Sequence, residues 1–93
     1  MASKEKIKKY LSLKALFESG SVKKMRDIEK LFPTMVAKDL QMNHSRYISK
    51  LYKPETFSFN QVFKLASLLN IDPHIISDII MSELSNNQKS KKK

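Results

Sequence analysis

Apolar residues recur at helical spacing along nearly the whole chain, and no segment shows a sustained strand-like alternation of apolar and polar residues. The pattern divides into six segments whose apolar residues stand three or four positions apart. We therefore expect an all-α fold, a compact bundle of five to six helices. The first four predicted helices span residues 4–19, 22–31, 34–41 and 44–53, and the last two begin near residues 58 and 72.

Several of the predicted boundaries carry residues that favour the start or the end of a helix. Gly20 stands where the first helix needs a left-handed residue to end. Ser58 and Gln61 form the pair of a capping box at the start of the fifth helix. Asp72 is expected to cap the sixth helix, with Pro73 at its first position, where no N–H group is needed.

Each predicted helix has an apolar side that we expect to be buried. In the first helix this side lies opposite the lysines and is expected to belong to the core. In the fourth helix, Ile48 and Leu51 are expected to face inward. The buried stripe expected for the fifth helix consists of Phe59, Val62, Phe63, Ala66 and Leu69.

The length of 93 residues indicates a single small domain with two flanking segments. We expect an N-terminal amphipathic basic helix in residues 1–20, a helical domain in residues 21–84 and a disordered lysine-rich tail in residues 85–93. The chain has no cysteine, so disulfides and thiolate chemistry are excluded. No apolar run approaches the roughly 20 residues of a membrane span and no signal peptide is evident, so we expect no membrane partner and a cytoplasmic location.

The net charge of +9 is distributed unevenly along the chain. Residues 1–14 carry five lysines and one glutamate, and residues 85–93 carry four lysines, so each segment has a net charge of +4. Residues 34–57 have a net charge of +2, whereas residues 58–84 carry one lysine and three acidic residues. Such a distribution favours a nucleic acid or an anionic membrane surface as the partner, although solubility alone would also explain it.

The third and fourth predicted helices are short and nearly contiguous, and the small residue Ala37 permits them to cross closely. This arrangement is typical of a helix-turn-helix, in which the second helix can enter the major groove. If Ile48 points to the core, a rotation of about 100° per residue places an acid-free set of polar side chains on the opposite side. That set consists of Arg46, Ser49, Lys50 and Lys53.

The chemistry of these side chains fits double-stranded DNA. Arg46 can bind guanine through two hydrogen bonds, and Asn43 can bind adenine or a phosphate. Asn43 and Ser45 lie at the N-terminal end of the predicted helix 44–53, and its two lysines suit backbone phosphates. The alternative is a solvated helix face on which Asn43 acts only as an N-cap.

The two histidines do not form a recognisable ligand set. His44 is either a DNA contact or a half-buried packing residue, and His74 has no metal-ligand spacing around it. The sequence also contains no evident pair of a nucleophile and a base. We therefore expect no metal, no cofactor, no small-molecule substrate and no enzymatic activity.

The segment TMVAKDLQMNHSRYISKLYKPETFSFNQVFKLASLLNID resembles the phage repressor and Cro-type, or lambda repressor-like, helix-turn-helix domain. The resemblance covers about residues 21–82 and is strongest in VAKDL (36–40) and LASLLNID (65–72). It implies a bundle of about five helices that binds DNA, usually as a dimer that regulates transcription in a bacterium or phage.

Two residues depart from the pattern of that family. Gln41 stands where the family prefers glycine, and a left-handed glutamine would cost about 1 kcal/mol, so a wider turn is expected. Pro33 stands where the family often has a glutamine that contacts phosphate. That contact is therefore lost or passes to Thr34.

The sixth predicted helix has more apolar residues than closing a bundle requires. Ile75 and Ile79 widen its apolar stripe, and we expect them to form the interface of a homodimer unless the first helix covers them. The sequence thus predicts a dimeric, sequence-specific transcriptional regulator that inserts helix 44–53 into the major groove. The alternative is a helical protein–protein interaction module, similar to an antitoxin or an adaptor.

Overall fold

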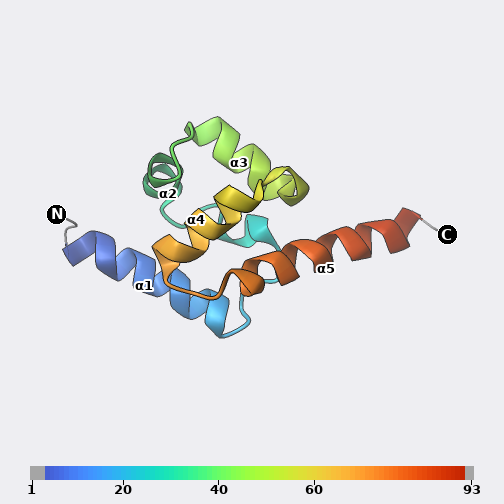
Figure 1. Ribbon diagram of the computed structural model, residues 1–93, viewed down its shortest axis with the longest axis horizontal. Helices are drawn as coiled ribbons and strands as arrows, with labels where there is room; N and C mark the ends of the chain where they lie inside the picture. The colour runs from blue at the N-terminus through green and yellow to red at the C-terminus, as the bar shows by residue number, and fades with distance from the viewer. Residues whose placement is uncertain (1–3, 92–93) are drawn as a thin grey trace.

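The first helix ends where the sequence predicts (Figure 1). The computed structural model describes residues 4–91, and α1 spans Lys4–Glu18. Gly20 follows with a φ of 80°, and the N–H of Ser21 donates to the carbonyl of Leu16 at 3.0 Å. These features close the helix with a left-handed residue, as glycine permits.

The described part of the chain is all-α, which confirms the predicted fold class (Figure 1). No strand occurs in residues 4–91. Helix α5 runs away from the body of the molecule and gives it a long dimension of 51 Å. After α1 follow the 3-10 helix η1 (Met25–Ile28), α2 (Pro33–Asp39), α3 (His44–Tyr52), the 3-10 helix η2 (Pro54–Thr56), α4 (Phe59–Leu69) and α5 (Pro73–Lys91).

The prediction of a helix in residues 22–31 is wrong, because this segment forms only the short 3-10 helix η1. The carboxylate of Asp27 accepts hydrogen bonds from the backbone N–H groups of Lys23 and Lys24, at 2.9 and 3.0 Å. The N–H of Met25 donates to the buried carboxylate of Glu83 in α5, at 2.8 Å. Side-chain acceptors thus satisfy the N–H groups at the start of the segment and hold it in a tight turn.

The turn between α2 and α3 is tight rather than wide. Gln41 adopts a φ of 62°, in the left-handed region. Its N–H donates to the carbonyl of Lys38 at 2.9 Å, and the N–H of Met42 donates to that of Ala37 at 3.0 Å. This is the hydrogen-bond pattern of a Schellman motif, with glutamine in the position that glycine usually occupies.

The inward side of α3 differs from the expected one. Tyr47 and Leu51 are fully buried, whereas Ile48 is only half-buried. In α4 the outer part of the expected stripe is in solvent, because Phe59 is 80% exposed and Phe63 is 58% exposed. The remaining members of that stripe are buried as expected: Val62, Ala66 and Leu69.

Helix α1 belongs to the core, as its apolar side predicts. Leu13 and Phe17 are buried, and the N-terminal half of the helix is tied to α2. The hydroxyl of Tyr10 and the ammonium of Lys6 both bind the carboxylate of Asp39. Burial opposes ionisation of Asp39, but these two hydrogen bonds and the charge of Lys6 outweigh it and lower its pKa below the usual value.

Helix α5 packs through Ile76 and Ile80, which are buried, and its start is capped by Asp72 as expected. The helix continues to Lys91, through most of the segment 85–93 for which the sequence predicts disorder. Residues 92 and 93 lie outside the described residues. The capping box predicted between Ser58 and Gln61 is present, with both hydrogen bonds formed.

Replacing Gln41 with glycine should stabilise the fold, because glycine adopts the left-handed region without a steric penalty. We expect Gln41→Gly to raise the free energy of unfolding by about 0.5–1 kcal/mol in urea titrations followed by circular dichroism. Lys38→Gly is the matched control, since Lys38 is exposed inside α2 and glycine there should cost about 1 kcal/mol. Destabilisation by both substitutions would contradict the left-handed turn.

Replacing Tyr47 with phenylalanine should also stabilise the fold. The Tyr47 hydroxyl is buried and has no hydrogen-bond partner among the described residues. Its removal is expected to raise the free energy of unfolding by about 1 kcal/mol. Tyr10→Phe is the control and should be destabilising by a similar amount, because it removes the hydrogen bond to Asp39.

The same substitution should change the response to alkali. Burial raises the pKa of Tyr47 above its usual 10.0, so above that pH the unfolded chain ionises while the folded chain does not. Stability therefore falls as the pH rises above 10.0, and we expect a shallower fall in Tyr47→Phe. Equal slopes for the two proteins would show that Tyr47 does not contribute.

Candidate nucleic-acid interface

The exposed side of α3 is set by the two residues that anchor it. With Tyr47 and Leu51 buried and about 100° per residue, Ser45 and Ser49 lie almost opposite the core. Arg46 lies on the flank of this outer side, and all three of these polar side chains are exposed. The helix His44–Tyr52 contains no acidic residue, so its solvent-facing side is neutral or positive.

Asn43 caps α3. Its side-chain oxygen accepts the N–H of Arg46 at 2.8 Å, so the oxygen is engaged and the amide nitrogen remains as a donor. His44 is exposed in the first turn of the helix. The structure therefore shows the N-cap role of Asn43 directly.

The two lysines assigned to the outer side of α3 have different surroundings. The ammonium of Lys50 donates to the carbonyl of Thr56 at 2.7 Å and lies 6.0 Å from the centre of the Phe57 ring. Lys50 is thus half-buried and turned toward η2, because the helix is rotated from the expected orientation by about one residue. Lys53 is exposed at the end of α3.

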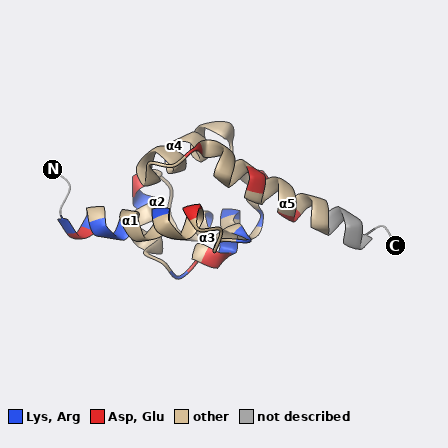
Figure 2. Ribbon diagram, turned by 90° about the horizontal axis from the view of Figure 1, so that it is seen from below, with Lys and Arg blue, Asp and Glu red and all other residues tan. Residues whose placement is uncertain are grey.

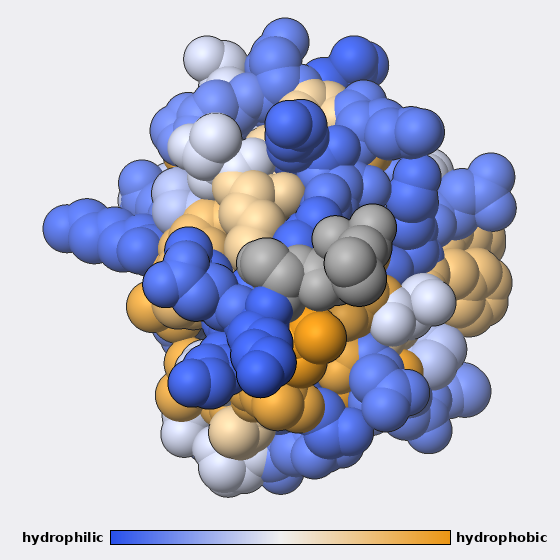
Figure 3. All heavy atoms as spheres, turned by 90° about the vertical axis from the view of Figure 1, so that its left-hand side faces the viewer, coloured by the Kyte–Doolittle hydropathy of each residue, from blue (hydrophilic) through white to orange (hydrophobic). Residues whose placement is uncertain are grey.

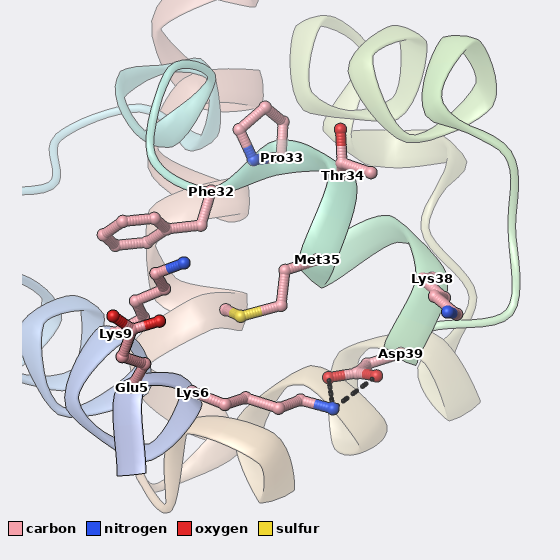
Figure 4. A pocket seen from close by; sticks show the side chains of 9 residues that line it. All are labelled: Glu5, Lys6, Lys9, Phe32, Pro33, Thr34, Met35, Lys38 and Asp39. Atoms are coloured by element: carbon pink, nitrogen blue, oxygen red, sulfur yellow. Dashed lines mark hydrogen bonds and ion pairs between the residues drawn. The ribbon is translucent and has the colours of Figure 1, made fainter. Parts of the chain in front are cut away.

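Thr34 is exposed in the first turn of α2, at the edge of an open cleft of about 560 Å³ between α1 and α2 (Figure 4). Lys6 crosses this cleft to Asp39, and the ammonium of Lys9 lies 5.4 Å from the centre of the Phe32 ring. The cleft therefore brings basic side chains of α1 close to the start of α2.

The basic run in residues 23–26 has no predicted role, and the structure places it against α3. The guanidinium of Arg26 lies 5.7 Å from the centre of the Tyr52 ring. These two side chains line a cleft of about 410 Å³ together with Lys23 and Lys24. The Tyr52 hydroxyl donates to Glu29, which raises the pKa of Tyr52. The density of cations in KKMR was the available signal.

The charges separate into two regions of the molecule. Figure 2 shows basic residues along α1 and around α2 and α3, whereas α4 and the described part of α5 are mostly uncharged with a few acidic positions. The basic region includes all the polar side chains of α3 described above. A polyanion would therefore meet this side of the molecule first.

Comparison of the chain with family models, curated proteins and solved structures finds no match. The packing of α3 and the distribution of charge are therefore the observations that bear on function. No helix within residues 4–91 is long and apolar enough to cross a membrane. Within the same residues, no cluster of three acidic or histidine side chains is arranged to hold a metal ion.

The two residues expected at a dimer interface are not the exposed ones. Ile75 and Ile79 are half-buried and pack against the core, and their expected place in a dimer interface stays a prediction. The exposed apolar residues of this part of the molecule are Phe59, Phe63 and Met81. Met81 is the exposed apolar residue of α5, and it lies on the flank of the helix opposite to Ile75 and Ile79.

Proposed function

We propose that the protein binds double-stranded DNA in a sequence-specific manner, with α3 in the major groove, and that it regulates transcription as a cytoplasmic homodimer. The observation that carries this proposal is the acid-free outer side of α3, on which Arg46 is exposed beside Ser45 and Ser49. A major groove about 12 Å wide admits a helix that presents such side chains.

The packing of α2 and α3 supports a helix-turn-helix. The two helices contact each other and are joined by a short turn that Gln41 closes. Both are held on the core, α2 by Val36 and Ala37 and α3 by its two anchors. The resemblance of the sequence to the phage repressor and Cro-type domain supports the same assignment.

The proposal gives each exposed side chain of the interface a role. Arg46 is the base-contacting residue, because its long guanidinium group can reach the edge of a guanine. Three shorter side chains near Arg46 can also contact DNA: His44, Ser45 and Ser49. The amide nitrogen of Asn43 is a further hydrogen-bond donor. Contacts to backbone phosphates come from Lys53 and Thr34 at the two edges, and Lys50 contributes least.

A protein–protein interaction module is the second candidate function. The exposed aromatic pair Phe59 and Phe63 favours it, because large apolar side chains in water often mark a binding surface. Salt dependence separates the two functions. Binding to a DNA duplex weakens steeply with added salt, because counterions are released from the phosphates, whereas an apolar protein contact does not.

The first test of the proposal is Arg46→Ala. The probe is a DNA duplex that the unmutated protein selects from random sequences. In fluorescence anisotropy titrations we expect the substitution to weaken the binding free energy by about 1–3 kcal/mol. Specificity should relax at one base pair while the fold is kept. Lys8→Ala removes the same charge at an exposed position of α1, outside both α3 and the α4–α5 side, and is the control. Equal affinities for both variants would reject the groove assignment.

The second test compares the two lysines of the α3 region. Lys53→Ala should reduce the slope of log affinity against log salt by about one unit, because one phosphate contact is lost. Lys50→Ala should change the slope less, since its ammonium is held by the carbonyl of Thr56. A larger effect for Lys50 would show that the side chain turns to DNA on binding and that the described hydrogen bond is replaced.

A further inference from the structure

Two phenylalanines of α4 are exposed one helical turn apart. Phe59 is 80% exposed and Phe63 is 58% exposed, although both belong to the apolar pattern of the helix. Residues four positions apart lie on the same side of a helix, so the two rings form one surface. Aromatic side chains of this size are enriched in the cores of protein interfaces.

The rings border a hollow between α4 and α5. A cavity of about 180 Å³ is lined by both phenylalanines together with Val62, Pro73, His74 and Ser77. Met81 is 65% exposed and follows Ser77 by one helical turn, so it extends the same side of α5. We name this surface, consisting of Phe59, Phe63, Pro73, His74, Ser77 and Met81, the α4–α5 patch.

The α4–α5 patch lies in the one stretch of the sequence that has a net negative charge. Residues 58–84 carry one lysine and three acidic residues in a protein whose net charge is +9. Two copies of so basic a chain repel each other wherever their basic regions meet. The α4–α5 side is therefore where a second copy meets the least repulsion (Figure 2).

We propose that the α4–α5 patch binds the same patch of a second copy of the chain. A two-fold axis places Phe63 of one copy against the hollow of the other, so that each copy supplies both a projecting ring and a cavity. When α4 of one copy crosses α5 of the other, Lys64 approaches the other copy's Asp78. Both residues are exposed, and neither forms an ion pair within the described part of its own chain.

The size of the patch indicates a weak dimer. A phenylalanine buries roughly 150–250 Å², so the exposed parts of the two rings supply on the order of 300 Å² per copy. Met81, Pro73 and His74 add to this, and the total remains at the low end of specific interfaces. We therefore expect a dissociation constant on the order of 10 µM.

A second exposed apolar pair is a poor site for another copy and serves as a control. Ile7 is 50% exposed and Leu11 is 56% exposed, also one turn apart, on α1. The first 14 residues have a net charge of +4, from five lysines and one glutamate. Figure 3, which faces the end of the molecule where α1 begins, shows apolar atoms bordered by strongly hydrophilic side chains.

Sedimentation equilibrium of the full chain without DNA tests the proposal. We expect the double substitution Phe59→Ser and Phe63→Ser to raise the dissociation constant at least about tenfold. The double substitution Ile7→Ser and Leu11→Ser removes a similar apolar area from α1 and should leave the dissociation constant unchanged. Met81→Lys, at an exposed position, should also weaken association, and circular dichroism verifies that each variant is folded.

Salt gives an independent readout. Added salt screens the repulsion between two chains of charge +9 and also the two exposed Lys64–Asp78 pairs. Because such exposed pairs contribute little, dimerisation should strengthen as salt is raised. A monomer at about 100 µM, or equal losses in the two double variants, would overturn the proposal. The inference refines the homodimer of the proposed function, but the test contains no DNA. Its failure therefore leaves DNA binding by α3 intact, and a failure of DNA binding leaves the sedimentation result intact.

Discussion

The burial of Tyr47 and Leu51 is the constraint on which the rest of the interface depends. Because these two side chains anchor α3, they determine which residues of a nine-residue helix face solvent. An anchor at Ile48 would have turned Lys50 outward, whereas the anchor at Tyr47 turns it to Thr56 and places Ser45 and Ser49 outermost. A shift of one residue in the anchor thus changes the chemistry that the helix can offer a partner.

The features that the sequence predicted well are those decided by near neighbours. The left-handed Gly20, the capping box of Ser58 and Gln61, and the Asp72 cap all depend on residues within a few positions. The failure at η1 has a long-range cause, because the N–H of Met25 is bound by a carboxylate 58 positions away. Periodicity also could not show that the neighbouring helices cover only part of the apolar stripe of α4.

In the candidate site, too, the sequence predicted the features that depend on near neighbours and missed those that depend on long-range packing. The acid-free composition of α3 and the capping position of Asn43 were evident from sequence, since both are local. The contribution of the basic run 23–26 was not, because it requires η1 to pack against α3. The structure therefore has two chemically different sides: a basic one built from α1, η1, α2 and α3, and a largely uncharged one built from α4 and the first part of α5.

An NMR titration of the ¹⁵N-labelled protein with a selected DNA duplex tests whether α3 is the helix that contacts DNA. We expect the largest amide shift changes in residues 43–49 and smaller ones in the basic run 23–26. If only the homodimer binds the duplex, signals of α4 and α5 change as well, but they should change in the same direction when the protein is concentrated without DNA. Changes that are confined to α4 and α5, with the amides of α3 unaffected at saturating DNA, would contradict the assignment of α3 as the recognition helix.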